Sequence, residues 1–224
     1  MPAAKVDMLP AKLSKSQVIS TYRALAGSYD LWAHFTEAAA RKRALELAAI
    51  RGGEAVLEIA VGTGVLFEEV VKQNRQGRNE GLDLTDAMLE RAKARLSKLI
   101  GASHSLRIGD AYDLPYGEAE FDLVLNNYMF DLLPEADFPR VLSEMKRVLK
   151  PGGRLVLVNM TTGGGLLDRA WARLYKVSPW LLGGCRAVEL SGFVKESGFE
   201  RVERDIVRQL SFPSEVLRAW KPSI

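Results

Sequence analysis

One stretch in the first third of the chain constrains the fold more than any other: Val56-Leu57-Glu58-Ile59-Ala60-Val61-Gly62-Thr63-Gly64-Val65-Leu66-Phe67. It begins as a short apolar run without the 3.6-residue period of a helix, which is typical of a strand buried on both faces. Small residues follow at Ala60, Gly62 and Gly64, and an amphipathic run continues to about Gln73. Strand, tight turn and helix in this order predict the opening unit of a nucleotide-binding α/β sheet.

The composition of this turn separates two kinds of ligand. A Cβ at Gly62 or Gly64 would hold a ligand away from the backbone, and the start of the next helix offers unpaired N–H donors. A dinucleotide-binding turn has a third glycine two residues further on, which is absent here. Glu58 lies at the strand end, where a carboxylate would repel a pyrophosphate but suits a ligand with an ammonium group. An NAD(P)-dependent oxidoreductase is therefore the less favoured interpretation.

The composition agrees with one α/β domain. The 224 residues are 47% hydrophobic and 26% charged, with a net charge of +3, and they contain no dense Lys/Arg block, so nucleic acid is not an expected partner. The single cysteine, Cys185, excludes an internal disulfide, and with two histidines it makes no metal site. Residues 1–13 lack the apolar core of a signal peptide, and no run is long enough to span a membrane. We expect a cytoplasmic protein.

The rest of the chain alternates between apolar runs and amphipathic stretches. Two helices, at about 14–26 and 37–49, precede the first strand. After the opening unit we expect strands at 80–84, 105–108, 121–126 and 154–160, helices at 87–96, 136–149 and 187–197, and two strands on either side of Pro213. This order predicts a doubly wound, Rossmann-like, seven-stranded mixed sheet whose last hairpin is antiparallel.

Polar residues stand at the ends of these predicted strands. Asp83 lies about 20 residues beyond the glycine turn, where a carboxylate accepts both hydroxyls of an adenosine ribose. Met88 follows one turn into the next helix and can pack on an adenine face or in the core. Asn126 and Asn127 are costly to bury without partners, so they either face a polar ligand or cap local backbone.

Several motifs together resemble the class I S-adenosylmethionine (SAM) dependent methyltransferases. The turn is similar to their motif I, acidic-x-Gly-x-Gly-x-Gly, with Ala60 in place of the first glycine. Gly109-Asp110-Ala111 is similar to the family's adenine-edge motif, and Leu149 to Leu155 reads Leu-Lys-Pro-Gly-Gly-Arg-Leu, an architectural marker of the family. The resemblance implies SAM as cofactor, S-adenosylhomocysteine as product, and the following cofactor contacts: Tyr29, Glu58, Ala60, Gly62, Gly64, Asp83, Leu84, Met88, Asp110, Ala111, Asn126 and Asn127.

The resemblance also suggests a lid and catalytic residues. In many small-molecule methyltransferases a helical leader folds over the cofactor, so Tyr22, Tyr29 and Trp32 either face the ligand or pack the leader on the body. Asp131 follows the fourth predicted strand, where relatives often carry a histidine, and is the first candidate for orienting or deprotonating an acceptor. Tyr22 and His34 are further catalytic candidates. His104 is expected at the surface.

Within the superfamily the chain looks like the branch of ubiquinone/menaquinone-biosynthesis C-methyltransferases and phospholipid N-methyltransferases. We expect a helical lid at 14–50, a SAM-binding core at 54–160, a substrate cap and helix at 161–198 and a hairpin at 199–224. Aromatic and basic residues alternate in 166–186, which suits a lipophilic or anionic substrate, a membrane surface, or a helix with basic ends. The acceptor is expected to be an amine, a phospholipid head group or a quinone-type ring. A SAM-binding regulatory protein without catalysis is the alternative.

Overall fold

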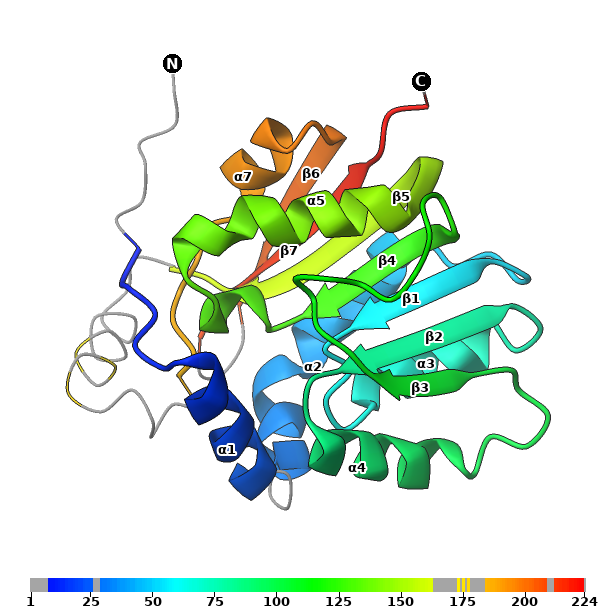
Figure 1. Cartoon of the computed structure of the whole chain (residues 1–224), viewed down its shortest axis with the longest axis horizontal. Helices are drawn as coiled ribbons and strands as arrows, with labels where there is room; N and C mark the ends of the chain where they lie inside the picture. Colours follow the sequence, from blue (N-terminus) through cyan, green and yellow to red (C-terminus); the bar gives the residue numbers. More distant parts are fainter. Residues whose placement is uncertain are drawn as a thin grey trace.

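The computed structural model describes residues 8–25, 29–162, 173, 175, 177, 184–208 and 212–223, without the side chains of 25 and 29–35. The strands in these residues form one seven-stranded sheet in the order β3-β2-β1-β4-β5-β7-β6 (Figure 1). Their bounds are β1 Ala55–Ile59, β2 Arg78–Asp83, β3 Ser105–Ile108, β4 Phe121–Asn127, β5 Leu149–Met160, β6 Glu200–Val207 and β7 Ser214–Trp220.

The sheet is parallel except for its last hairpin. β1 pairs with β2 and β4, and β4 pairs with β5, all in parallel register. β7 is antiparallel to both β5 and β6. Because the order reverses next to β1, the carboxyl ends of β1 and β4 flank a crevice of the kind in which open α/β sheets bind ligands. The predicted fold class is confirmed.

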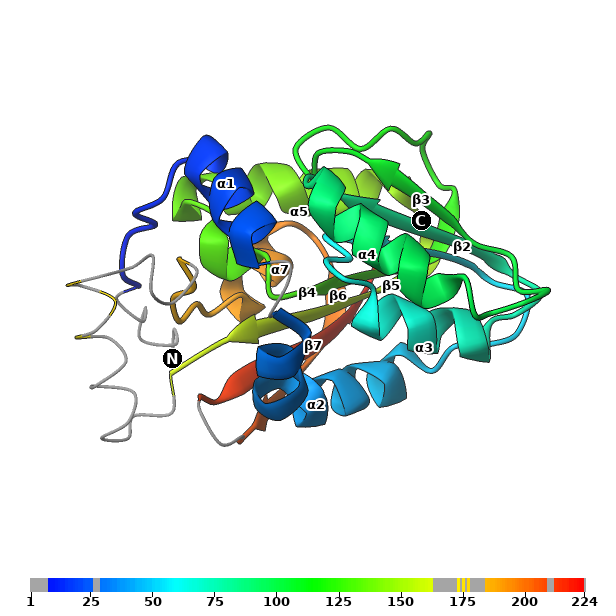
Figure 2. The same ribbon diagram turned by 90° about the horizontal axis from the view of Figure 1, so that it is seen from below.

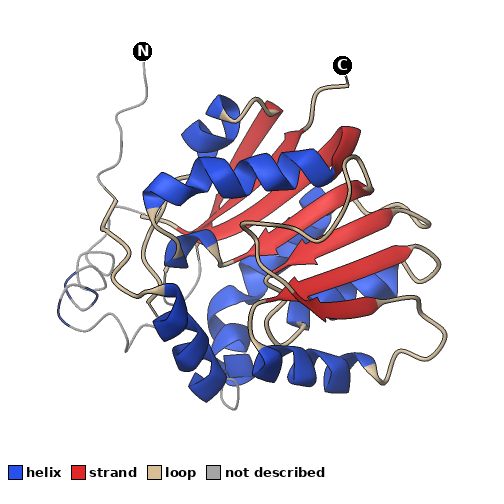
Figure 3. Ribbon diagram, viewed as in Figure 1, coloured by secondary structure: helices blue, strands red, loops and turns tan. Residues whose placement is uncertain are grey.

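Helices cover both faces of this sheet (Figures 2 and 3). Helix α5, Phe138–Val148, and helix α7, Ser191–Glu196, contribute to one core cluster with the strands. The other core cluster contains side chains of α2, Tyr29–Ala48, α3, Val65–Gln73, and α4, Asp86–Leu96. The apolar stripe of α3 is fully buried there, as its 3.6-residue pattern predicts: Leu66, Phe67, Val70 and Val71.

The leader differs from the sequence prediction in one respect. Helix α1, Lys15–Leu25, lies where expected, but α2 begins at Tyr29 instead of about residue 37. The prediction used apolar periodicity, which is weak over 29–36.

Two further boundaries shift because of tertiary hydrogen bonds. β5 begins at Leu149, five residues before the predicted start, and the Gly152 N–H bonds to the Lys221 carbonyl at 3.0 Å. The Pro-Gly-Gly segment is therefore part of the strand and not a turn before it. α7 begins only at Ser191, because the residues before it donate to other segments: Val188 N–H bonds to the Met160 carbonyl.

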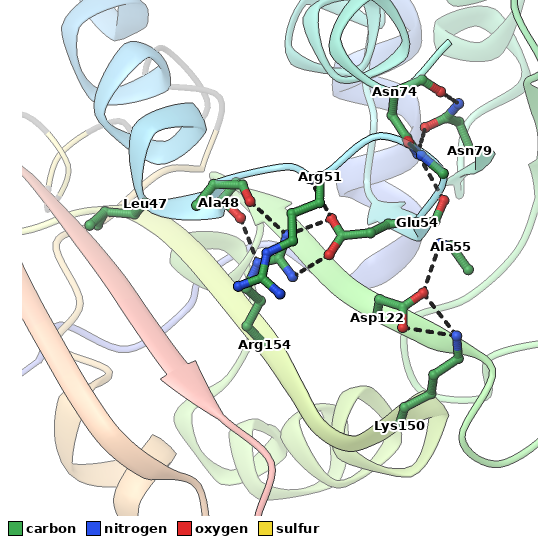
Figure 4. Close-up of polar contacts among 12 residues, drawn as sticks. Leu47, Ala48, Arg51, Glu54, Ala55, Asn74, Asn79, Asp122, Lys150 and Arg154 are labelled. Carbon is green, nitrogen blue, oxygen red and sulfur yellow. Dashed lines mark hydrogen bonds and ion pairs between the residues drawn. The ribbon is translucent and has the colours of Figure 1, made fainter. Parts of the chain in front are cut away.

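A group of polar contacts holds α2 against the amino ends of the strands (Figure 4). Arg154 on β5 forms an ion pair with Glu54, with nitrogen–oxygen distances of 2.8 and 2.6 Å, and both side chains are mostly buried. The same guanidinium donates to the carbonyls of Ala48 and Ala49 at the end of α2. These contacts fix the C-terminal end of α2 near the amino ends of the strands, on the side of the sheet opposite the crevice. No helix in the described ranges is both long and apolar enough to cross a membrane.

Candidate functional site

A pocket lies between α2 and the turn that follows β1. The empty space in this pocket is about 330 Å³, including the part that is open to solvent. The pocket brings together four residues that the sequence identified, Glu58, Ala60, Gly62 and Asn127. The complete lining is Glu37, Arg41, Glu58, Ala60, Val61, Gly62, Thr63, Val65, Leu66 and Asn127.

Glu58 is the most unusual group in this pocket. It is 1% exposed at the end of β1, and its Oε2 atom has no hydrogen-bond partner. Burial raises its pKa well above the usual range, and the nearby carboxylate of Asp83 raises it further, while the Arg41 guanidinium opposes the shift. Arg41 itself pairs with Glu37 one turn earlier on α2, at 3.1 Å. A buried, unpaired carboxyl oxygen of this kind suits a ligand that brings its own N–H donors.

The turn after β1 has the backbone conformation of a glycine-rich loop. Ala60, Gly62 and Gly64 have φ angles of 58°, 54° and 79°, so Ala60 adopts a left-handed conformation that glycine would adopt without strain. A Cβ on Gly62 would meet no atom within 4 Å. A Cβ on Gly64 would lie 3.0 Å from the Cβ of Ala92 on α4. Gly62 therefore leaves open space above the backbone, whereas Gly64 allows α4 to pack closely.

Asp83 and Asp110 lie at the ends of neighbouring strands. Asp83 is 7% exposed and accepts from the N–H groups of Gly62 and Thr85, each at 2.8 Å. Burial raises its pKa, and these hydrogen bonds only partly offset the rise. The carboxylate of Asp110 accepts from the Tyr112 N–H and forms an ion pair with Lys15 of α1. Helix α1 is thus held over the ends of β2 and β3.

The other predicted cofactor contacts have mixed surroundings. Asn126 donates to the Ile59 carbonyl on the neighbouring strand β1 at 2.8 Å, and not to local backbone as the capping interpretation predicts. Its Oδ1 atom has no partner, and neither has that of Asn127. Met88 is 1% exposed, Ala111 is buried and Leu84 is half-buried. Their contacts with a cofactor stay a prediction.

A second group of polar side chains lies beyond the end of β4, and we name it the Asp131 cluster: Tyr22, Asp131, Cys185 and Arg186. Asp131 and Arg186 are buried, and Tyr22 and Cys185 are half-buried. Asp131 is 0% exposed and neither of its carboxyl oxygens has a hydrogen-bond partner of normal geometry. Burial raises its pKa to about 7, with Glu37 adding to the shift and Arg186 opposing it. The Tyr22 hydroxyl lies 3.4 Å from the Cys185 sulfur, which joins α1 to the cluster. Burial also raises the pKa of the Cys185 thiol well above its usual range.

Some residues of these sites were not found from the sequence. Glu37 and Arg41 stand four residues apart, a spacing that indicates a helical ion pair but not its burial. The residues next to Arg186 in the sequence do not indicate that it is buried, because its burial depends on segments distant in sequence. The side chains of Tyr29, Trp32 and His34 and most of the predicted cap lie outside the described residues. His104 is exposed, as predicted, and the described residues hold no cluster of metal ligands.

The pocket fits the chemistry of SAM. The open space over Gly62 and the unpartnered acceptor oxygens of Glu58 and Asn127 suit an amino-acid head with an ammonium group. Carboxylates stand at the ends of β2 and β3, with Asp83 where a ribose-binding acid is expected. Fold and site together define a SAM-dependent methyltransferase domain.

Comparison with known proteins identifies the family. Residues 56–153 match the methyltransferase domain family. The demethylmenaquinone methyltransferase of Oceanobacillus iheyensis is 30% identical over 186 residues, covering 73% of this chain and 76% of that protein. The chain belongs to this family of SAM-dependent methyltransferases. An arsenite methyltransferase of Halobacterium salinarum is 27% identical over 70% of this chain, and the chain spans only 40% of that protein.

A solved structure shows the same fold. The phosphoethanolamine N-methyltransferase 2 of Haemonchus contortus, in complex with SAM, superposes with a TM-score of 0.68 at 17% identity, covering 81% of this chain and 52% of that one. At this identity the likeness concerns the fold, and the acceptor has to be argued from the site itself.

Proposed function

We propose that this chain transfers a methyl group from SAM to a small or lipophilic acceptor that must lose a proton, with a quinone-type ring in its hydroxylated form as the first choice. The observation that carries the proposal is Asp131. It is fully buried, its oxygens have no hydrogen-bond partner of normal geometry, and burial raises its pKa to about 7. A group that ionises near neutral pH, in a dry site, is suited to accept a proton from a phenolic acceptor.

The cofactor contacts follow from the pocket. Glu58 and Asn127 receive the amino-acid head of SAM over Gly62, Asp83 binds the ribose and Asp110 the adenine edge. When bound, SAM supplies an activated methyl group on a sulfonium. The chain supplies alignment in a water-poor site, and a well-oriented pair of reactants gains roughly 7–11 kcal/mol in this way.

The leader acts as the lid of this site. Lys15 pairs with Asp110, and Tyr22 contacts Cys185, so α1 touches both the proposed adenine side and the Asp131 cluster. Closure of α1 and α2 over the cofactor would exclude water and complete the acceptor site. The segment 161–198 is the proposed substrate cap and helix. Its described residues include buried Tyr175, whose hydroxyl donates to the Pro10 carbonyl at 3.0 Å.

The choice of acceptor is supported by the demethylmenaquinone methyltransferase relative. Amines and phospholipid head groups are the other acceptors of this branch, and they need no base because an amine loses its proton easily. A lipophilic acceptor would bring the protein into peripheral contact with a membrane. The remaining alternative is that the chain binds SAM but does not transfer its methyl group. The methyl-transfer screen described next distinguishes this alternative from the proposed enzyme.

The test is a methyl-transfer screen by mass spectrometry, with hydroquinones, other phenols, amines, thiols and phospholipid head groups as acceptors. We expect product with hydroquinones, and loss of most turnover in Asp131→Asn with SAM affinity retained. Asp205→Asn is the control, because this carboxylate is an exposed one on β6 that pairs with Arg43. Product from amines alone would refute the acceptor class, and SAM binding without product from any class would refute the enzyme.

A further inference from the structure

The structure contains a buried arginine whose hydrogen-bonding capacity is mostly unused. Arg186 is 1% exposed and lies in the segment that leads into α7. One of its terminal nitrogens, Nη2, donates to the Leu133 carbonyl, but Nε and Nη1 have no hydrogen-bond partner. The guanidinium lies 5.8 Å from the ring centre of Phe138. Leaving two nitrogens of a buried charged group without hydrogen-bond acceptors is energetically costly, unless a ligand supplies the acceptors.

Asp131 is adjacent to this arginine, and its carboxyl oxygens lack hydrogen-bond donors as two nitrogens of the arginine lack acceptors. The Arg186 N–H donates to the Asp131 carbonyl at 3.3 Å, so the two backbones are in contact. Their charged groups influence each other's ionisation but form no direct ion pair, and both carboxyl oxygens of Asp131 lack partners. The two side chains together therefore offer unsatisfied donors and acceptors at one buried place. Glu37, which lines the proposed cofactor pocket, is close enough to Asp131 for the two carboxyl groups to interact.

We propose that Arg186 is the oxyanion receptor of the acceptor site: it binds an ionisable oxygen of the acceptor through one of its two unpartnered nitrogens, Nε or Nη1, while Asp131 accepts the proton that this oxygen loses. The acceptor class is thereby narrowed to molecules with an acidic hydroxyl, such as phenols and enols. This inference rests on the proposed function. Arginine suits the role because its guanidinium stays charged and donates charge-assisted hydrogen bonds to an oxyanion.

The charge balance of the step supports this pairing. Before the step the site holds a carboxylate, a guanidinium and a neutral hydroxyl. The O–H bond of the acceptor then breaks, its proton forms an O–H bond on Asp131, and the electron pair stays on the acceptor oxygen beside Arg186. The net charge of the buried site is the same before and after, so the step requires no additional charge to be buried.

The groups around the pair come from several elements. Glu37 of α2 and Cys185 act on the ionisation of Asp131, and Tyr175 and Glu135 act on that of Arg186. Tyr22 of α1 reaches the pair through Cys185. Because Glu37 opposes ionisation of Asp131, it favours the protonated carboxyl, which is the form that follows proton transfer.

The test uses 4-nitrophenol as probe with the full chain and S-adenosylhomocysteine, so that no turnover is needed. The absorption spectrum of this phenol distinguishes its ionised from its neutral form. We expect the bound probe to be the phenolate at a pH where the free probe is mostly neutral, and 4-nitroanisole, which cannot ionise, to bind much more weakly. Arg186→Gln should lower probe affinity about 10- to 100-fold and abolish the phenolate spectrum.

Arg173→Gln is the matched control, since Arg173 is exposed in the same region of the chain. Arg186→Lys keeps the charge but not the guanidinium, and should retain ionisation with weaker binding; it also serves if the glutamine variant does not fold. Equal binding of 4-nitroanisole, or an unchanged phenolate spectrum in Arg186→Gln, would overturn the proposal. A phenolate spectrum without methylated product in the screen would remove the proposed function and leave the oxyanion receptor.

Discussion

Alanine substitutions at the two glycines of the turn after β1 allow effects on SAM binding to be separated from effects on folding stability. Gly62 and Gly64 both have positive φ angles, 54° and 79°, so alanine at either position is strained by about 1–2 kcal/mol. Part of this loss, about 0.4–1 kcal/mol, is offset because alanine restricts the unfolded chain. Backbone strain alone therefore predicts that each variant loses about 1 kcal/mol of unfolding free energy.

Packing makes the two positions unequal. An added Cβ on Gly64 would lie 3.0 Å from the Cβ and 3.2 Å from the Cα of Ala92, whereas one on Gly62 meets nothing within 4 Å. Forcing extra atoms into a packed contact costs about 1–3 kcal/mol more. We therefore expect Gly64→Ala to lose about 2–4 kcal/mol of unfolding free energy and Gly62→Ala about 1 kcal/mol or less.

For SAM binding we expect the opposite ranking: Gly62→Ala should be the more damaging of the two variants. The Cβ of Gly62→Ala would project into the pocket, where it would keep the head of SAM from the backbone. We expect its SAM dissociation constant to rise about tenfold or more, which corresponds to roughly 1.4 kcal/mol. Urea unfolding at fixed pH measures the first effect and calorimetric titration with SAM the second. Equal stability losses in the two variants, or wild-type SAM affinity in Gly62→Ala, would refute this reasoning.

Three further substitutions test other parts of the structure. Burial raises the pKa of Asp131 from 3.8 to about 7, so the folded state is favoured while Asp131 is protonated, and this stability is lost as the pH rises from about 4 to about 7. Asp131→Asn should therefore be more stable than wild type by up to about 4 kcal/mol at pH 8 in urea unfolding. If the difference between the two proteins did not depend on pH, the burial of an ionisable Asp131 would be contradicted. Arg154→Met leaves Glu54 and the carbonyls of Ala48 and Ala49 without their partner, and should lose about 3–5 kcal/mol of unfolding free energy. Lys72→Met breaks only partly exposed pairs and should lose less than about 1 kcal/mol; equal losses would contradict the role of the Arg154 contacts. Asp83→Ala should weaken SAM binding by about 1–3 kcal/mol in calorimetry, and an unchanged dissociation constant would remove Asp83 from the site.

The parts of the site that could be predicted from sequence are those carried by one local motif. Glu58, Ala60 and Gly62 lie together because one strand and one turn place them, and Asn127 joins them because parallel strands end at a common edge. The packing role of Gly64 was not visible, since it depends on Ala92, 28 positions later by residue number. The burial of Arg186 next to Asp131 has the same cause: these residues are far apart in sequence, and only the fold brings them together.

The sequence alone determined the order of strands and helices, the glycine turn and the acidic strand ends, because apolar periodicity and turn chemistry act over a few neighbouring residues. It also determined membership of the methyltransferase family through motifs of the same short range. Only the tertiary structure decided where β5 and α7 begin, which glycine faces the pocket, and how ionisation is altered at Glu58 and Asp131. Burial and charge are properties of the space around a side chain, and that space is built by segments that the local sequence does not contain.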